Sequence, residues 1–423
     1  MTTIKKKHFT PRDFINVPDK NIYESAEYFQ KFIDQMDQQS ANAFDITSKT
    51  ITGSKMTIVD RYSKNPINTT SYVTNNYLGM NKHPKVLEAA KKTLEEYGIG
   101  TCASPIIGGR LDIHHLLEEK IAKLYDKEDA LIFSSGYSAN IGAFQFLLNK
   151  MDIAIVDMFV HASIYDGLGC TNTKIFKHND IEYLEKTLKL TVGKYRNIAI
   201  IIDGVYSQDG DLPKLVEICD LAKKYGSFVF VDDAHGVGVF GEGGKGTTNH
   251  FGVSDKVDLV TGTFSKSMGT SGGYAVGSKP LIKYMKHLSR ASTFSASVAP
   301  PVVAAASKAI DLFTEEPQII DKLWENTHYI KKQLLNKGFD IGKSESPITP
   351  IMIRDDMKTK IIARKLLDKG IYIIPATYPA VKLKDSRLRM NITSQHTKED
   401  LDYFCEALLD IDKKYNFRTN ISD

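Results

Sequence analysis

The sequence predicts an α/β fold, with a largely parallel sheet and helices on both of its faces. Short apolar runs have the length and composition of buried strands. They lie at residues 130–133, 153–156, 198–202, 228–231 and 259–263. Helical apolar spacing fills the stretches between them, as at residues 212–225. Strands that alternate with helices in this way are typical of βαβ units, so we expect the strands to run parallel.

The remaining pattern predicts further helices and a second lobe. Pro84 opens a helix that reaches about residue 97, because proline is favoured in the first helical turn. Residues 113–125 also have helical apolar spacing, and Pro300 opens a long helical stretch to about residue 337. Short strands and helices then alternate in a small α+β lobe. The expected divisions are an N-terminal arm (1–70), a large domain (71–300), and a linking helix with a small C-terminal domain (301–423).

Length, charge and cysteine content exclude several classes of protein. A chain of 423 residues is long for one core, so two or more lobes are expected. The net charge of +4 predicts no nucleic-acid partner. No apolar run approaches the roughly 18 residues that a membrane span needs. The four cysteines are scattered without metal-ligand spacing, which predicts no metal site, reduced thiols and a cytoplasmic location.

Lys266 stands in the most informative stretch, Val260-Thr-Gly-Thr-Phe-Ser-Lys-Ser-Met-Gly269. It follows a predicted core strand among small residues, so its amine can lose solvent and its pKa can fall. A neutral amine can form a Schiff base with an aldehyde, and the hydroxyls of Thr263 and Ser265 are suited to a phosphate. These features together indicate pyridoxal phosphate. Taken alone, the stretch also fits a surface lysine in a flexible loop.

A second stretch, Ser227-Phe-Val-Phe-Val-Asp-Asp-Ala-His235, places an acid at a strand end and a histidine three residues later. Asp232 can pair with the ring nitrogen of the cofactor and keep it protonated, and His235 can donate to the ring hydroxyl oxygen. Taken alone, Asp232 and Asp233 also fit helix caps. An Asp-x-x-His segment followed by a strand-end lysine is a rarer combination. The run at residues 241–246 fits G-x-G-x-x-G outside a βαβ unit, so we expect no dinucleotide site.

These motifs, in this order, resemble the α-oxoamine synthases, a branch of the fold-type I pyridoxal-phosphate enzymes. The resemblance runs from about Asn75 to about Asp402. Its further segments are Asn75-Asn-Tyr-Leu-Gly79, Phe133-Ser-Ser-Gly-Tyr-Ser-Ala-Asn140, His161-Ala-Ser163, His178-Asn-Asp180, Asp203-Gly-Val-Tyr-Ser-Gln-Asp-Gly-Asp211, Phe294-Ser-Ala-Ser297, and Arg387-Leu-Arg389 with His396-Thr397. The resemblance implies the fold-type I transferase architecture.

The resemblance also implies where the cofactor would bind. A helix start with Ser135, Gly136 and Tyr137 is expected to bind its phosphate, since helix N-termini favour anions. His161 would stack on the ring, and Ser207 would form part of the pocket wall. Without the resemblance, an ordinary glycine turn and a structural histidine are the simpler interpretations.

Two serines, Ser295 and Ser297, resemble the segment by which a neighbouring subunit touches the phosphate. The implied assembly is a homodimer with a shared active site. The catalytic residues implied by the whole resemblance are Lys266, Asp232, His161 and His235.

An arginine can bind the carboxylate of the substrate through two parallel hydrogen bonds from its planar guanidinium, and the resemblance, matched at His396, implies that this residue is Arg389. Asn75 would assist from the N-terminal side. Alternation along residues 387–392 puts Arg387 and Arg389 on one face of a strand. A surface salt bridge fits Arg387 better than Arg389.

The implied reaction condenses an amino acid with an acyl-CoA or acyl-carrier-protein thioester, loses carbon dioxide and gives an α-amino ketone. The C-terminal half looks most like bacterial serine palmitoyltransferases. This likeness predicts a long acyl chain and serine, or a related amino acid such as cysteate, in sphingolipid or sulfonolipid biosynthesis. The alternatives are glycine C-acetyltransferase, 8-amino-7-oxononanoate synthase and, further away, a fold-type I aminotransferase. Pro105 stands where most relatives have arginine, which leaves the choice of thioester and amino acid open.

Overall fold

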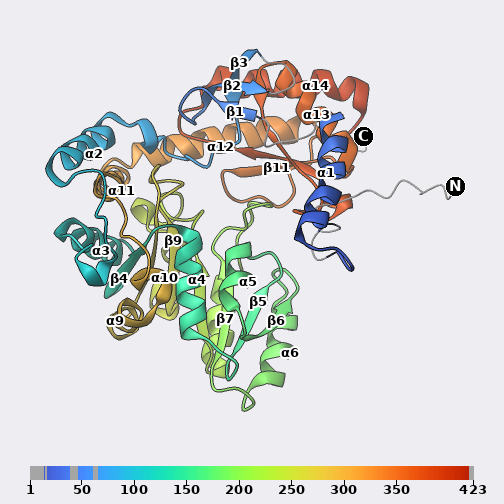
Figure 1. Ribbon diagram of the computed structural model, residues 1–423. Coiled ribbons are helices and arrows are strands. Elements are labelled where there is room, and N and C mark those ends of the chain that lie inside the picture. The colour runs from blue at the N-terminus through green and yellow to red at the C-terminus, as the bar shows by residue number, and fades with distance from the viewer. Residues whose placement is uncertain (1–13, 15–16, 39–45, 61–64, 419–423) are drawn as a thin grey trace.

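The computed structural model describes residue 14 and residues 17–38, 46–60 and 65–418, and Figure 1 shows two lobes. The lower lobe in that view holds the large sheet with its helices. The upper lobe holds smaller sheets with α12 (Gln318–Asn336), α13 (Asp356–Asp368) and α14 (Lys398–Tyr415). Within the described ranges, no helix combines the length and the apolar character needed to cross a bilayer.

Seven strands form the large sheet in the order β4-β10-β9-β8-β7-β5-β6. They are β4 (Asp129–Phe133), β10 (Gly273–Gly277), β9 (Leu259–Thr263), β8 (Phe228–Asp232), β7 (Ile198–Asp203), β5 (Ile153–Asp157) and β6 (Asn172–Phe176). The pairings from β9 through β8, β7 and β5 to β6 are all parallel. All five predicted strands lie in this sheet, so the α/β prediction is confirmed.

Strand β10 is the exception to the parallel order, because it runs antiparallel to both β4 and β9. The sequence analysis did not predict this strand. Its glycine ends, Gly273 and Gly277, are unusual in a strand and are more typical of turns. At Gly273 a side chain would collide with the backbone of Ser135 and Gly136, so the glycine lets β10 pass close to the helix that starts at Gly136.

Both faces of the large sheet are buried, because alternate residues of a strand point to opposite sides. In β7, Ile200 and Ile202 belong to one apolar cluster, whereas Ala199 and Ile201 belong to the other. The first cluster includes α3 (Asp112–Leu124), α6 (Ile181–Thr191), α7 (Leu215–Tyr225) and α11 (Pro300–Glu315). The second includes α4 (Gly136–Leu147), α5 (Ala162–Leu168) and α9 (Lys279–Leu288). Helices therefore cover both faces, as predicted.

The upper lobe contains two smaller sheets. One has the order β11-β14-β13, with bounds Ile348–Met352, Arg387–Asn391 and Ile374–Ala376, and its pairings are antiparallel. The other joins β1 (Ile46–Ser48), β2 (Lys55–Asp60) and β3 (Pro66–Ser71) to β12 (Ile371–Tyr372). Strands β1 and β2 and most of β3 lie in the expected N-terminal arm, and they therefore belong to a sheet that includes a C-terminal strand. The division of the chain into three domains stays a prediction.

The remaining helices are α1 (Ile22–Gln38), α2 (Pro84–Tyr97), α8 (Thr247–His250) and α10 (Arg290–Thr293). Pro84 opens α2 as predicted, and the helix at 113–125 appears as α3. The single helical stretch expected from Pro300 to about residue 337 is wrong, because α11 ends at Glu315 and α12 begins at Gln318. Pro317 lies at the break, since proline lacks an amide hydrogen and disfavours helical backbone in the residue before it.

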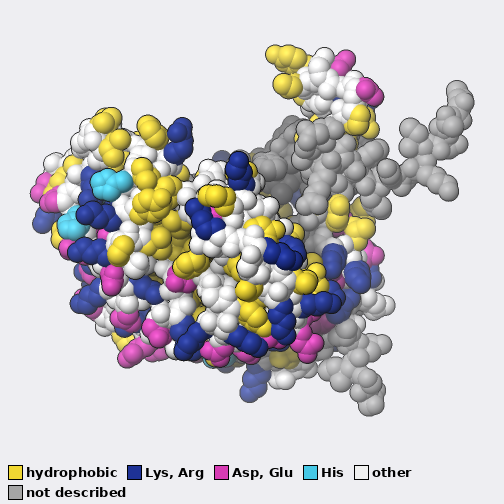
Figure 2. Space-filling view, turned by 90° about the horizontal axis from the view of Figure 1, so that it is seen from below, with side chains coloured by type: hydrophobic (Ala, Val, Ile, Leu, Met, Phe, Trp, Pro, Cys, Tyr) yellow, Lys and Arg dark blue, Asp and Glu magenta, His cyan; other side chains and the backbone are white. Residues whose placement is uncertain are grey.

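The surface does not display a single sign of charge. On the face seen from below in Figure 2, Lys and Arg side chains are interspersed with Asp and Glu side chains. This mixture accords with the net charge of +4. All four cysteines are free thiols, Cys102 and Cys170 exposed and Cys219 and Cys405 buried. Among the described residues, no group of His, Cys, Asp and Glu is arranged to hold a metal ion.

Candidate active site

The candidate site lies at the carboxyl edge of the large sheet, where ligands bind in parallel α/β sheets. Asp203 ends β7 and is the register partner of Asp232, which ends β8. Lys266 follows β9 by three residues. These strand ends surround a cavity of about 300 Å³, which is within the range of small-molecule sites. The predicted residues that line it are Ser135, Gly136, Tyr137, His161, Ser207, Asp232, His235, Thr263, Ser265 and Lys266.

Lys266 is half-buried among the strand ends, and it lines the cavity. Desolvation lowers the pKa of Lys266 from 10.5 to about 8. The nearby Arg389 cation lowers it further, whereas the Asp232 carboxylate opposes the shift. A larger fraction of the Lys266 amine is therefore neutral near neutral pH than for an exposed lysine. A neutral amine can act as a nucleophile and as a base.

Asp232 is held by two donors that occupy one oxygen each. Asn140 Nδ2 donates to Oδ2 at 2.7 Å, and the amide of Ala234 donates to Oδ1 at 3.1 Å. Asn140 is itself fixed, because its Oδ1 accepts a hydrogen bond from Thr261 Oγ1 at 2.6 Å. Hydrogen bonds of this kind favour the charged carboxylate. The buried acid is therefore suited to pair with a positively charged ring nitrogen.

The network continues from Asn140 to His161, the candidate for ring stacking. Asn140 Nδ2 also donates to Ser163 Oγ at 2.8 Å, and Ser163 Oγ donates to His161 Nδ1 at 2.7 Å. His161 caps α5, and its ring is exposed toward the cavity. Desolvation lowers the pKa of His161, so the ring is a neutral, oriented plane. Asn140 lies within a segment of the family resemblance but was not predicted as a site residue.

His235 is oriented by Tyr77, a second residue that the sequence analysis did not single out. The Tyr77 hydroxyl lies 2.7 Å from His235 Nδ1, and both side chains are buried. Desolvation and the neighbouring Lys266 and Arg389 cations hold the pKa of His235 well below its usual value. His235 is therefore neutral and keeps one ring nitrogen available for a ligand.

The opposite end of the cavity is built to hold an anion. Ser135 caps α4 and accepts a hydrogen bond from the amide of Ser138 at 3.0 Å, so the amides of Gly136 and Tyr137 remain for a ligand. A side chain at Gly136 would come within 2.8 Å of the Thr263 side chain, so only glycine fits here. The hydroxyls of Thr263 and Ser265 lie 2.9 Å apart beside this helix start.

Taken together, these residues fit pyridoxal phosphate. The helix start and hydroxyls suit its phosphate, Asp232 suits its ring nitrogen, and Lys266 suits its aldehyde. Bound there, the cofactor would supply an electron sink for a carbanion next to an amino group.

Arg389 lies beside this cavity on β14 and makes only neutral contacts within the described residues. Its Nε donates to the carbonyl oxygen of Ser207, and its Nη2 donates to Asn75 Oδ1 at 3.3 Å. No ion pair involves Arg389 in the described part of the chain, so its charge is available for a substrate carboxylate. Arg387 instead pairs with Asp209, as expected, but the Arg387 side chain is buried and only Asp209 is partly exposed. The correction follows from the loop at residues 204–211, which covers this face of β14.

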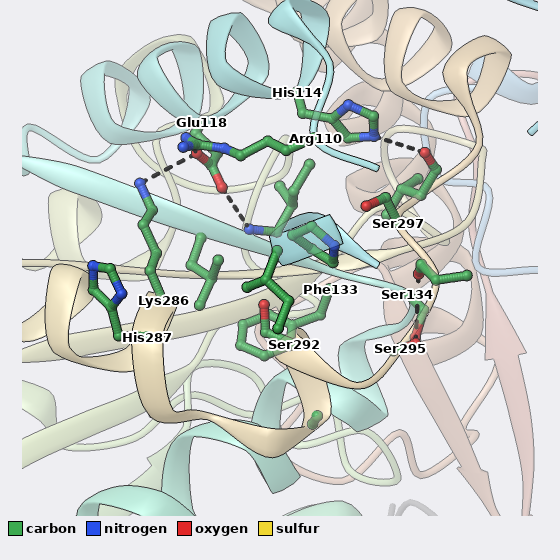
Figure 3. A pocket seen from close by; sticks show the side chains of 17 residues that line it. Arg110, His114, Glu118, Phe133, Ser134, Lys286, His287, Ser292, Ser295 and Ser297 are labelled. Carbon is green, nitrogen blue, oxygen red and sulfur yellow. Dashed lines mark hydrogen bonds and ion pairs between the residues drawn. The ribbon is translucent and has the colours of Figure 1, made fainter. Parts of the chain in front are cut away.

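Ser295 and Ser297 do not line the Lys266 cavity. They line an adjacent pocket, shown in Figure 3, with Ser134 and Pro105. Ser134 borders both cavities, and Ser295 Oγ lies 3.5 Å from Ser134 Oγ. The hydroxyl of Ser297 is buried and has no partner among the described residues. A contact of these serines with the phosphate of a neighbouring subunit stays a prediction.

Charged side chains occupy the other side of the pocket in Figure 3. Buried Glu118 pairs with Arg110 and with Lys286, and Glu118 Oε1 accepts from the amide of Ile132 at 3.3 Å. These charges are matched within the described chain. Pro105 lines this adjacent pocket and does not line the Lys266 cavity.

Comparison with known proteins gives a consistent family. The aminotransferase class I and II family matches residues 71–408. An 8-amino-7-oxononanoate synthase of Alkaliphilus oremlandii is 42% identical over 345 residues, which cover 81% of this chain and 87% of the relative. A serine palmitoyltransferase of Sphingobacterium spiritivorum is 40% identical over 343 residues, which cover 81% and 86%.

Solved structures give a likeness over nearly the whole length. A serine palmitoyltransferase of Sphingomonas wittichii has a TM-score of 0.88 and 30% identity, and the match covers 95% of this chain and 100% of that chain. A serine palmitoyltransferase solved with pyridoxal phosphate has a TM-score of 0.87 and 31% identity, with 94% and 100% covered.

Proposed function

Because the chain belongs to the α-oxoamine synthases, pyridoxal-phosphate enzymes of the aminotransferase class I and II family, we propose that it joins serine, or a related amino acid such as cysteate, to a long-chain acyl thioester with loss of carbon dioxide. The observation that carries this choice is the likeness to solved serine palmitoyltransferases, which extends over 95% of the chain with a TM-score of 0.88. That likeness includes the C-terminal lobe, which carries Arg389.

The residues of the site have distinct tasks in this proposal. Arg389 binds the amino-acid carboxylate, with Asn75 beside it. The Lys266 amine, with its pKa of about 8, takes the proton from the α-carbon. Asp232 keeps a proton on the ring nitrogen of the cofactor, and His161 covers the ring and excludes water. His235 donates a hydrogen bond to the cofactor from the nitrogen that Tyr77 does not use.

A second candidate function rests on the 42% identity to an 8-amino-7-oxononanoate synthase. The carbon skeleton of that product requires alanine and a heptanedioyl thioester when one carbon dioxide is lost. Serine and alanine differ by one hydroxyl group, and the thioesters differ by length and by a terminal carboxylate. The two candidate functions therefore predict different pairs of amino acid and thioester.

The experiment is a matrix of glycine, alanine, serine and cysteate against acetyl, heptanedioyl and palmitoyl thioesters of CoA and of acyl carrier protein. Free thiol is titrated, carbon dioxide is collected and the product mass is recorded. Palmitoyl transfer to serine or cysteate supports the proposal, whereas turnover only with alanine and the heptanedioyl thioester establishes the second candidate. Turnover only with glycine and acetyl-CoA excludes both. Amino transfer to a 2-oxo acid without thiol release identifies an aminotransferase.

The shared site of a homodimer is part of the same proposal, together with a cytoplasmic location, which the four free thiols support. A Ser295→Glu subunit would repel the phosphate of its neighbour, and a Lys266→Ala subunit cannot hold the cofactor covalently. Mixed after reversible dissociation, the two inactive variants should regain about a quarter of the wild-type activity, because half of the dimers are mixed and each has one intact site. Absence of any recovery would place Ser295 in the site of its own subunit.

A further inference from the structure

Two loops contribute to the lining of the Lys266 cavity, through His161 and Ser207, and they follow the neighbouring parallel strands β5 and β7. The loop after β5 leads from Asp157 to His161. The loop after β7 carries Ser207, whose carbonyl oxygen holds Arg389 in place. Strands β5 and β7 are register partners, so the two loops start side by side. The relative position of His161 and Arg389 therefore depends on what joins these loops.

His178 joins them through both ring nitrogens. It lies two residues after β6, and its Nδ1 is 3.0 Å and 3.1 Å from the two oxygens of Asp157. Its Nε2 is 2.7 Å from Asp211 Oδ2, at the end of the loop after β7. Each nitrogen faces a carboxylate, and only the doubly protonated ring can donate to both. Burial opposes this charge, but the bonds to Asp157 and Asp211 outweigh it and raise the pKa of His178 to about 9.

The surroundings restrict the ring to this position. The centroid of Phe159 lies 4.6 Å from that of His178 on one side, and the centroid of Tyr206 lies 4.4 Å away in an edge contact. Both flanking residues belong to the two loops that His178 joins. Asn179 adds a second connection, since its amide donates to Asp157 Oδ2 at 3.0 Å and its Nδ2 donates to the carbonyl oxygen of Leu212 at 2.9 Å.

We propose that His178 is a positioning residue, whose charged ring joins Asp157 to Asp211. Through this connection it sets the position of His161 relative to Arg389. The inference deepens the proposed function, on which the roles of His161 and Arg389 rest. His178 itself does not line the cavity, so it acts through the two loops rather than by contact with a ligand.

A matched control exists at the opposite end of the same strand. Arg196 pairs with buried Asp152 just before β5, with Nε to Oδ1 at 2.9 Å and Nη2 to Oδ2 at 2.7 Å. His178→Gln and Arg196→Gln each remove a cation from a buried carboxylate at one end of β5. Both variants should lose stability. Only the His178 variant should change the cavity.

The test titrates the two apoproteins with pyridoxal phosphate alone and records visible circular dichroism and thermal unfolding. His178→Gln should bind the cofactor about 10- to 100-fold more weakly than the wild type, the effect typical of groups that orient a site, and should alter the visible dichroism. Arg196→Gln should retain the wild-type affinity and spectrum. Wild-type affinity and dichroism in His178→Gln, or parallel losses in both variants, would overturn the proposal.

A milder variant keeps the test decisive where His178→Gln does not fold. Asp211→Asn keeps a hydrogen-bond acceptor opposite His178 Nε2 but removes its charge, so the same spectral change should appear at smaller size. An unchanged spectrum would overturn the proposal. Neither readout uses an amino acid or a thioester, so an error in the proposed substrates would leave these results unaffected and would appear only in the turnover matrix.

Discussion

Replacement of Lys266 by methionine is expected to stabilise the apoprotein while abolishing covalent attachment of the cofactor. The folded chain holds the Lys266 proton only below a pH of about 8, whereas the unfolded chain holds it up to a pH near 10.5. Between these values the unfolded chain binds more protons, so stability rises with pH. The full cost of the buried cation is therefore present below a pH of about 8 and is lost as the pH rises toward 10.5.

The magnitude follows from the same values. A pKa lowered from 10.5 to about 8 corresponds, at about 1.4 kcal/mol per pKa unit, to about 3 kcal/mol of stability at neutral pH. Methionine has a similar volume and no charge, so Lys266→Met should recover about 2–3 kcal/mol at about pH 7 and much less at about pH 10. The assay is urea unfolding of the apoprotein, followed by fluorescence, at both pH values.

Lys331 provides the control, because desolvation lowers its pKa to about 8 as well. It lies in α12, where its Nζ donates to the carbonyl oxygen of Ser344 at 3.0 Å. Lys331→Met should show the same pH-dependent gain in stability and should keep the visible absorbance of the bound cofactor. Lys266→Met should lose that absorbance. A stability difference for Lys266→Met that is equal at both pH values would refute the reasoning, because the amine would then not be desolvated.

Three further substitutions test the site. Asp232→Asn should still bind the cofactor, but kcat should fall by at least about 100-fold, since a preorganised charge is lost. A near-normal kcat would show that Asp232 does not hold the proton on the ring nitrogen. Arg389→Lys should raise the KM for the amino acid by about 10-fold or more and leave the thioester KM unchanged; equal rises in both would point to a general distortion. Tyr77→Phe leaves His235 without its 2.7 Å hydrogen-bond partner. The free energy of unfolding, measured with urea, should fall by about 1–3 kcal/mol, and an unchanged value would contradict that contact.

The sequence predicts features that are local in the chain. Strands appear as apolar runs, and Pro84 marks a helix start because proline acts within one turn. The strand-end positions of Asp232 and Lys266 follow from the same reasoning, since parallel strands end at one edge of the sheet. The break at Pro317 could also have been predicted, had the proline been given more weight than the helical periodicity around it.

Features that depend on distant contacts were not predictable in the same way. Asn140 holds Asp232 from 92 positions away, and Tyr77 holds His235 from 158 positions away. Uncharged polar residues such as these carry no periodic signal, and their roles arise only when the sheet brings separate segments together. The same holds for β10, whose pairing with β4 joins residues about 140 positions apart and is set by tertiary packing rather than by strand propensity.

Asp203 and Asp232 differ in their hydrogen-bond partners, and this difference is visible only in the folded structure. Both acids end apolar strands, although the sequence analysis assigned the ring nitrogen to Asp232 alone. The structure gives Asp232 two donors, Asn140 Nδ2 and the Ala234 amide, whereas Asp203 receives one long bond of 3.3 Å from the His161 amide. Burial and the neighbouring Asp232 charge raise the pKa of Asp203 well above its usual value. Two adjacent carboxylates cannot both be ionised at low cost. The hydrogen bonds from Asn140 and from the Ala234 amide therefore distinguish Asp232 from Asp203, and replacement of Asn140 should weaken this distinction.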